Sequence, residues 1–135
     1  MEVALVQLRS DLLQWARQPE NYDKELVGAI ANLLLRREYD SAIRKAFLIL
    51  TERMRAQFGA PATVDGEDLV NHAFGKQASP SLPEPTRVAL RNLFAGVYVL
   101  FRNRFSHQHV APTFAETDAA IGVVNWALHE LDKLP

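Results

Sequence analysis

The chain has 135 residues, which is within the usual size of one domain and enough to bury a hydrophobic core without disulfides or metals. Apolar residues make up 48% of it and charged residues 23%, an ordinary composition for a globular protein. The formal net charge of −1 argues against a broad, nonspecific nucleic-acid-binding surface. The lack of cysteine excludes disulfides, a thiolate nucleophile and a cysteine-based zinc site.

The N-terminus predicts neither an export signal nor a membrane anchor. It has no basic region and no long apolar run followed by small residues. Elsewhere no apolar run approaches the length needed to span a bilayer. Together with the lack of cysteine, this favours a cytoplasmic protein, and we expect a single domain over residues 1–135.

Apolar residues recur at helical spacing along the first half of the chain, and turn residues separate the segments. The predicted helices cover about residues 3–17, 23–36, 39–58 and 68–74. Pro19 marks the end of the first, and Gly59 provides a stop for the third. Asp65-Gly66 predicts the turn that precedes the short fourth helix.

The second half predicts two further helices. The proline-rich stretch 79–85 cannot be regular structure, but it is too short to separate two domains. A long helix follows, whose expected apolar stripe is Val88, Leu90, Leu93, Phe94, Val97, Leu100 and Phe101. Thr113 is predicted to cap the last helix, and Glu116 completes a capping box with it.

These elements predict the fold class. No segment shows strand alternation, so we expect an all-α fold, an antiparallel bundle of four long helices plus one or two short ones. Trp15 and Trp126 are expected in its core. Positive charge is concentrated in residues 31–56 and 81–110, which could line a groove for an anionic ligand or could simply be solvated helix faces.

Most enzyme signatures are absent from the sequence. The six glycines are scattered, so there is no phosphate-binding glycine loop, and no His-Glu-x-x-His, EF-hand or G-x-S-x-G pattern occurs. One dense polar run remains at the end of an apolar helix, Arg102-Asn103-Arg104-Phe105-Ser106-His107-Gln108-His109. This run is the candidate site.

Arginine and histidine together can cleave an RNA phosphodiester. Arginine offers a permanent positive charge with a planar geometry that suits phosphate oxygens. Histidine titrates near neutrality and can give or take a proton. RNA carries its own nucleophile in the 2′-hydroxyl group, so such a site needs neither a metal nor a protein nucleophile. We therefore expect no cofactor and no metal.

The spacing alone is a weak signal. An arginine with a histidine five residues later would arise by chance in roughly one shuffled chain in three. The run also holds a second, overlapping pair, Arg104 with His109, beside Arg102 with His107. The alternative interpretation is an ordinary helix C-terminus, where cations interact favourably with the helix dipole.

Longer stretches around this run resemble the Ymh-like branch of the HEPN superfamily. Residues 96–103 followed by His107 are similar to the HEPN signature, in which an arginine and a polar residue precede a histidine at the end of a long helix. Residues 38–55 and 65–74 resemble the helix and the short turn-and-helix that precede it in this branch. Arg104 departs from the branch, where proline often follows the Arg-Asn pair.

The resemblance implies a helical bundle that homodimerises, so that two motifs face one cleft and cut RNA without a metal. In it Arg102 binds and polarises the scissile phosphate, His107 transfers the proton, and Asn103 orients the site or contacts the substrate. Family members act in phage defence or as toxins paired with an antitoxin. Since others have lost catalysis, the alternatives are a non-catalytic dimerisation or RNA-binding module that works through a partner protein, and a helical adaptor without a nucleic-acid role.

Helical geometry agrees with a composite site. On one continuous helix, residues five apart lie about 140° around and about 7.5 Å along the axis, so Arg102 and His107 would not share a face. Either the helix breaks between them or each works with a residue of a second subunit. Gly96, Val99 and Asn103 form a face of small or short side chains, which permits close approach of a partner helix or of a helix within the bundle.

Overall fold

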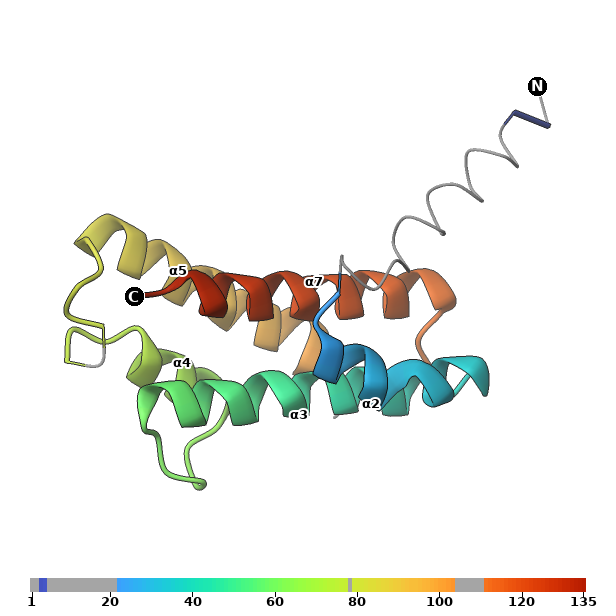
Figure 1. Cartoon of the computed structure of the whole chain (residues 1–135), viewed down its shortest axis with the longest axis horizontal. Helices are drawn as coiled ribbons and strands as arrows, with labels where there is room; N and C mark the ends of the chain where they lie inside the picture. Colours follow the sequence, from blue (N-terminus) through green and yellow to red (C-terminus); the bar gives the residue numbers. More distant parts are fainter. Residues whose placement is uncertain (1–2, 5–21, 78, 104–110) are drawn as a thin grey trace.

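The computed structural model describes residues 3–4, 22–77, 79–103 and 111–135. Within these ranges the chain forms α2 (Lys24–Leu35), α3 (Tyr39–Phe58), α4 (Gly66–Ala73), α5 (Glu84–Val97), the π-helical segment η2 (Tyr98–Asn103) and α7 (Phe114–Lys133) (Figure 1). The described ranges contain no strand, so the predicted all-α class is confirmed. The helix predicted over residues 3–17 lies outside them, except for Val3 and Ala4.

Local sequence signals set the helix ends. Gly59 ends α3 with a φ of 64°, a left-handed conformation that glycine adopts without steric cost. Thr113 and Glu116 form the predicted capping box, in which each side chain accepts a hydrogen bond from the other's backbone N–H. Asp23 caps α2 by accepting a hydrogen bond from the Leu26 N–H. The predicted boundaries therefore hold to within a few residues.

Helix α3 lies at the centre and contacts α2, α4, α7 and η2. It runs in the same direction as α7: the rings of Tyr39 and Phe114 meet near the start of both helices, and Gln57 Nε2 donates to the Leu131 carbonyl near their ends. Helices α2 and α5 run the opposite way (Figure 1). Among these helices, those that follow one another along the chain thus run in opposite directions, whereas α3 and α7 run in the same direction.

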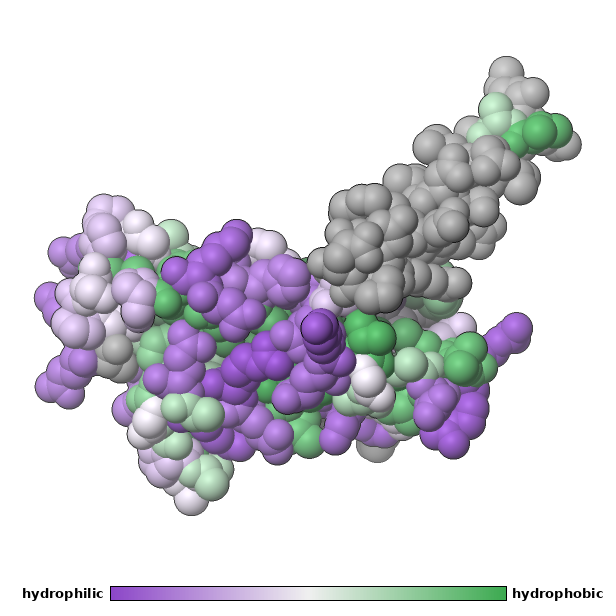
Figure 2. All heavy atoms as spheres, viewed as in Figure 1, coloured by the Kyte–Doolittle hydropathy of each residue, from purple (hydrophilic) through white to green (hydrophobic). Residues whose placement is uncertain are grey.

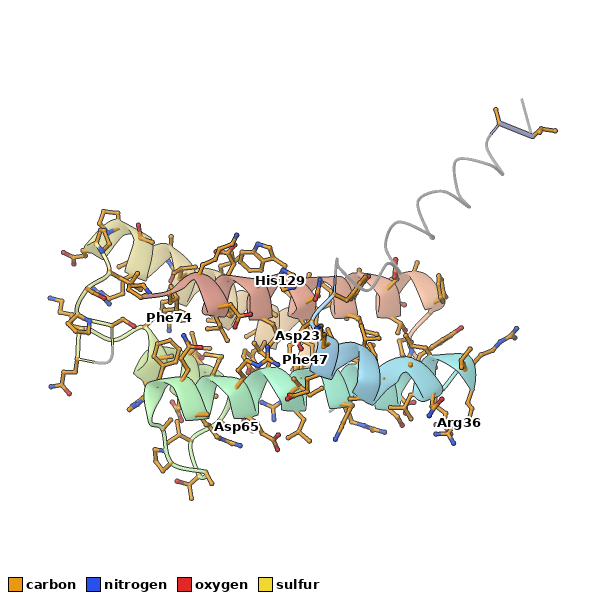
Figure 3. All side chains as sticks on the ribbon, in the orientation of Figure 1. Asp23, Arg36, Phe47, Asp65, Phe74 and His129 are labelled. Carbon is orange, nitrogen blue, oxygen red and sulfur yellow. The ribbon has the colours of Figure 1, made fainter. Side chains whose placement is uncertain are left out.

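Aromatic side chains fill the space between these helices. Phe47 comes from α3 and Phe74 from the end of α4 (Figure 3). The rings of Phe47 and Tyr98 pack edge to face, with 5.5 Å between their centroids. Phe74 stacks on Phe94 at 5.0 Å, and Phe94 stacks on Trp126 at 6.0 Å. Trp126 is nevertheless 37% exposed, so its expected place in the core is wrong.

The apolar stripe predicted for α5 divides into two. Phe94 and Val97 are buried, as expected, and Tyr98 joins them. Leu93 and Leu100 are instead 49% and 65% exposed, because the side of the helix that carries them faces away from α3. Figure 2 shows hydrophilic side chains over much of α3 and apolar side chains gathered around α2. None of the described helices is long and apolar enough to cross a bilayer.

One buried hydrogen bond joins α3 to η2. The hydroxyl oxygens of Thr51 and Tyr98 are 2.8 Å apart, and the two residues are 3% and 2% exposed. Because both residues are buried, their hydroxyls rely on partners within the protein, and the Tyr98 hydroxyl also donates to Met54 Sδ at 3.9 Å. Together with the packing of Phe47 on the Tyr98 ring, this bond fixes η2 against α3.

Tyr98→Phe should destabilise the fold, because it leaves the Thr51 hydroxyl buried without that partner. The expected loss in the free energy of unfolding is about 1–3 kcal/mol, measured by urea denaturation. The double variant Thr51→Val/Tyr98→Phe removes both polar groups and should be less destabilised than the two single losses added together. Tyr39→Phe, at a partly exposed tyrosine, is the control and should change little; a comparable loss there would contradict the assignment.

Candidate functional site

Arg102 lies near the end of η2, where the helix has widened from the α to the π form. In a π-helix each N–H bonds to the carbonyl five residues back, and such turns are frequent at functional sites. The Arg102 side chain is 26% exposed, so part of it is open to solvent. Leu100 precedes it on the outer surface, and Tyr98 on the buried side.

The Arg102 guanidinium is paired with Asp65, a residue that the sequence interpretation treated only as part of a turn. Arg102 Nη1 donates to Asp65 Oδ1 and Nη2 donates to Oδ2, each at 2.6 Å. Such a two-point contact is the strongest geometry that arginine and a carboxylate can adopt. The guanidinium carbon also lies 5.5 Å from the centre of the Tyr98 ring, within the range of a cation–π contact.

Asp65 is held independently by its own helix. It is the N-cap of α4, and its Oδ1 accepts a hydrogen bond of 2.7 Å from the Gly66 N–H. Gly66 has a φ of 56°, which a side chain would oppose. The preceding Val64 carbonyl accepts a hydrogen bond of 2.9 Å from Arg55 Nε on α3. Figure 3 shows Asp65 beside α3, at the N-terminal end of α4.

The ion pair keeps both of its members charged. The pKa of Asp65 is lowered mainly by its hydrogen bonds from Arg102. The hydrogen bond from the Gly66 N–H and the positive charges of Arg102 and Arg55 lower it further, whereas partial burial opposes the shift. The same hydrogen bonds raise the pKa of Arg102. At neutral pH the site therefore contains a fixed carboxylate and a fixed guanidinium.

The other predicted site residues are only partly placed. The backbone of Asn103 ends η2, but its side chain is not among the described parts of the chain. His107, and the alternative pair Arg104 and His109, fall within residues 104–110, outside the described ranges. Arg102 is thus the one residue of the predicted motif whose side-chain environment is known.

Much of the positive charge noted in the sequence is already paired. Arg53 contacts Asp23 and Glu25, Arg91 contacts Glu67, and Arg87 contacts Glu84. These pairs favour solvated and structural roles for the arginines over a continuous basic groove. Among the described residues, no three histidine, aspartate or glutamate side chains lie together as a metal site would require.

An apolar groove lies on the outer side of the helix that carries Arg102, between α5–η2 and α7. Its volume is about 380 Å³, and Leu93, Gly96, Leu100, Val123 and Trp126 are among the residues that line it. Apart from the nearby backbone of the helix itself, no atom of the described residues lies within 4 Å of the position where a side chain at Gly96 would begin. The groove is therefore an exposed apolar surface with room for an incoming side chain.

Comparison with known proteins gives one family. Residues 20–131 match the family described as "Protein of unknown function (Hypoth_ymh)". The matched range includes every helix from α2 to η2 and nearly all of α7, and it contains Arg102, Asp65 and His107. No curated protein and no solved structure matches the chain.

Asp65→Asn should remove a pH-dependent part of the stability. Because folding lowers the pKa of Asp65, its contribution to the free energy of unfolding is complete above the unfolded pKa of about 4 and is lost as the pH falls through the folded value. The wild type should therefore exceed the variant by more at about pH 7 than at about pH 3 in chemical denaturation. Asp118→Asn, at an exposed position on α7, is the control. A difference independent of pH would contradict the pairing.

Proposed function

The chain belongs to the Hypoth_ymh family, and we propose that it is a HEPN-type, metal-independent endoribonuclease that acts as a homodimer. The observation that carries the proposal is Arg102, a guanidinium held in a defined, partly exposed position at the end of a long helix, five residues before His107. This is the position that the HEPN signature gives to its phosphate-binding arginine. Such an enzyme would serve phage defence or act as a toxin restrained by an antitoxin.

The arrangement of the helices supports the fold part of the proposal. The long helices α2, α3, α5–η2 and α7 alternate in direction along the chain (Figure 1). In an up-and-down bundle of four helices, the second and fourth run in the same direction, as α3 and α7 do. We therefore assign the chain a HEPN-like antiparallel bundle, with the candidate arginine at the end of its third long helix.

The proposed reaction uses the substrate's own nucleophile. The 2′-oxygen attacks the adjacent phosphorus while the bond from phosphorus to the 5′-oxygen breaks, which leaves a 2′,3′-cyclic phosphate and a free 5′-hydroxyl. His107 accepts the proton of the 2′-hydroxyl or donates one to the departing 5′-oxygen. Arg102 stabilises the negative charge on the phosphate oxygens, and Asn103 orients the substrate or the site.

The apolar groove supports the dimer. Leu93 and Leu100 expose apolar surface next to Gly96, where a Cβ atom would have no described residue of another element within 4 Å. A second copy that packs there buries this surface and brings two α5–η2 helices together. The two Arg102 side chains would then approach each other, as a composite site with the partner's motif requires.

The ion pair favours a second candidate, a non-catalytic dimerisation or RNA-binding module that works through a partner protein. Asp65 neutralises Arg102 and takes hydrogen bonds from both of its terminal nitrogens. An arginine whose sole role is to hold η2 against α4 would make the same contacts with Asp65. RNA binding without cleavage by the purified protein would select this candidate.

Arg102→Ala and His107→Ala should each abolish RNA cleavage. Loss of a positioned proton-transfer group commonly lowers the rate by about 10²–10⁴-fold. Cleavage by the wild type should persist in excess EDTA, and mass spectrometry should find 2′,3′-cyclic phosphate ends, with DNA left uncut. Products with 5′-phosphate ends formed only with Mg²⁺ would overturn the proposed chemistry.

Two controls separate the motif from its surroundings. Arg44→Ala removes an exposed arginine of α3 that pairs with Asp40, and it should leave cleavage unchanged. His109→Ala should cost much less activity than His107→Ala. An essential His109 with a dispensable His107 would mean that Arg104 and His109 form the true pair.

Gly96→Leu should weaken the dimer without unfolding the chain. The position is open, and leucine favours a helix over glycine by about 1 kcal/mol, so the single chain should tolerate the change. Sedimentation should show a wild-type dimer at micromolar concentration and a shift of the variant toward monomer. Gly28→Leu, at an equally open position on α2, is the matched control. A wild type that remains monomeric would contradict the dimer.

A further inference from the structure

Asp65 and Arg102 meet because α3 supports both of them. Thr51 and Arg55 lie one turn apart on α3. Thr51 holds the hydroxyl of Tyr98, over whose ring Arg102 lies. Arg55 holds the carbonyl of Val64, the residue before Asp65. Each member of the ion pair is therefore fixed to the same helix through a separate set of contacts.

The carboxylate of Asp65 has little freedom to follow Arg102. Its Oδ1 is bound to the Gly66 N–H at 2.7 Å, and the N-terminus of α4 favours its negative charge. The long arginine side chain is flexible by comparison, with several rotatable bonds. In this pair the aspartate is thus the fixed partner, and the arginine takes its orientation from it.

The contact with Asp65 uses one edge of the Arg102 guanidinium, and a second edge takes no part in it. A guanidinium has five N–H groups, and both Nη atoms of Arg102 donate to Asp65 along the end-on edge. The side edge, formed by Nε–H and the second N–H of the neighbouring Nη, donates no hydrogen bond to any of the described residues. That edge still offers two parallel N–H groups, the geometry that binds two phosphate oxygens.

We infer that Asp65 is a positioning residue for Arg102: it takes the end-on edge of the guanidinium and presents the side edge to a phosphate group. The inference rests on the proposed function for the identity of the ligand. It gives the ion pair a role beyond joining α4 to η2, because the orientation of the arginine is fixed before the substrate arrives. Such preorganisation lowers the cost of binding the charge that develops in the transition state.

The structure offers a matched control in Asp23. Asp23 is also an N-cap, accepts a hydrogen bond from its own helix, and is paired with an arginine through both carboxylate oxygens, at 2.5 and 3.0 Å from Arg53. This second pair joins α2 to α3. Asp23→Asn therefore removes the same kind of charge and the same kind of contact as Asp65→Asn, without touching Arg102.

The test compares Asp65→Asn and Asp65→Ser with Asp23→Asn. Asparagine and serine are both good N-caps, so α4 should keep its start and circular dichroism its helical signal. The first readout is the NMR signal of the Arg102 guanidinium, assigned by its loss in Arg102→Lys. The wild type and Asp23→Asn should show separate Nη signals from hindered rotation, whereas both Asp65 variants should show averaged signals.

The second readout is cleavage of single-stranded RNA. Both Asp65 variants should lower kcat roughly 10- to 100-fold, with a smaller change in KM, because misplacement affects the transition state more than binding. Asp23→Asn should leave kcat unchanged.

Faster cleavage by Asp65→Asn would overturn the inference and make Asp65 an inhibitor that occupies Arg102. Unchanged Arg102 signals in both Asp65 variants would overturn it as well. A wild type that does not cleave RNA refutes the proposed function, and the NMR comparison then decides alone whether Asp65 orients Arg102.

Discussion

The hydrogen bond between Thr51 and Tyr98 is the interaction on which the candidate site depends. It lies in the core, where neither hydroxyl has access to water, and the burial raises the pKa of Tyr98 to about 12. The phenol therefore stays neutral and keeps the bond over the physiological pH range. Because η2 cannot slide along α3 without breaking it, the bond fixes the position of the segment that ends with Arg102.

Two aspartate–arginine pairs perform the same structural task at different places. Each aspartate satisfies the N-terminus of a helix and also binds an arginine from another element, so one carboxylate both caps a helix and joins it to its neighbour. Asp23 joins α2 to α3 in this way, and Asp65 joins α4 to η2. What distinguishes the second pair is its arginine, Arg102, which belongs to the motif that the sequence predicts at the end of the long helix. The Asp65–Arg102 contact, which joins α4 to η2, can therefore also orient the arginine of the candidate site.

The sequence predicts what neighbouring residues determine, and it misses what the tertiary structure determines. Gly59 and the Thr113–Glu116 capping box act within one helical turn, so the ends of α3 and α7 were predictable. The partner of Arg102 lies 37 residues away, and nothing local in Asp65-Gly66 indicates which arginine the carboxylate meets. The outward side of α5 was missed for the same reason. Helical spacing places Leu93 and Phe94 in one stripe, and only the position of α3 decides which of them is buried.

The α5–η2 helix presents three surfaces within a short stretch of chain. Its inner side, with Phe94 and Tyr98, is held in the core, its outer side exposes Leu93 and Leu100 along the groove, and its end carries Arg102. Packed helices transmit displacement because their interiors are dense and resist compression. A second copy that packs against Leu100 acts on the backbone two residues before Arg102. In the proposed dimer, assembly and the orientation of the arginine are therefore coupled, and the anchors at Tyr98 and Asp65 set how far the arginine can move.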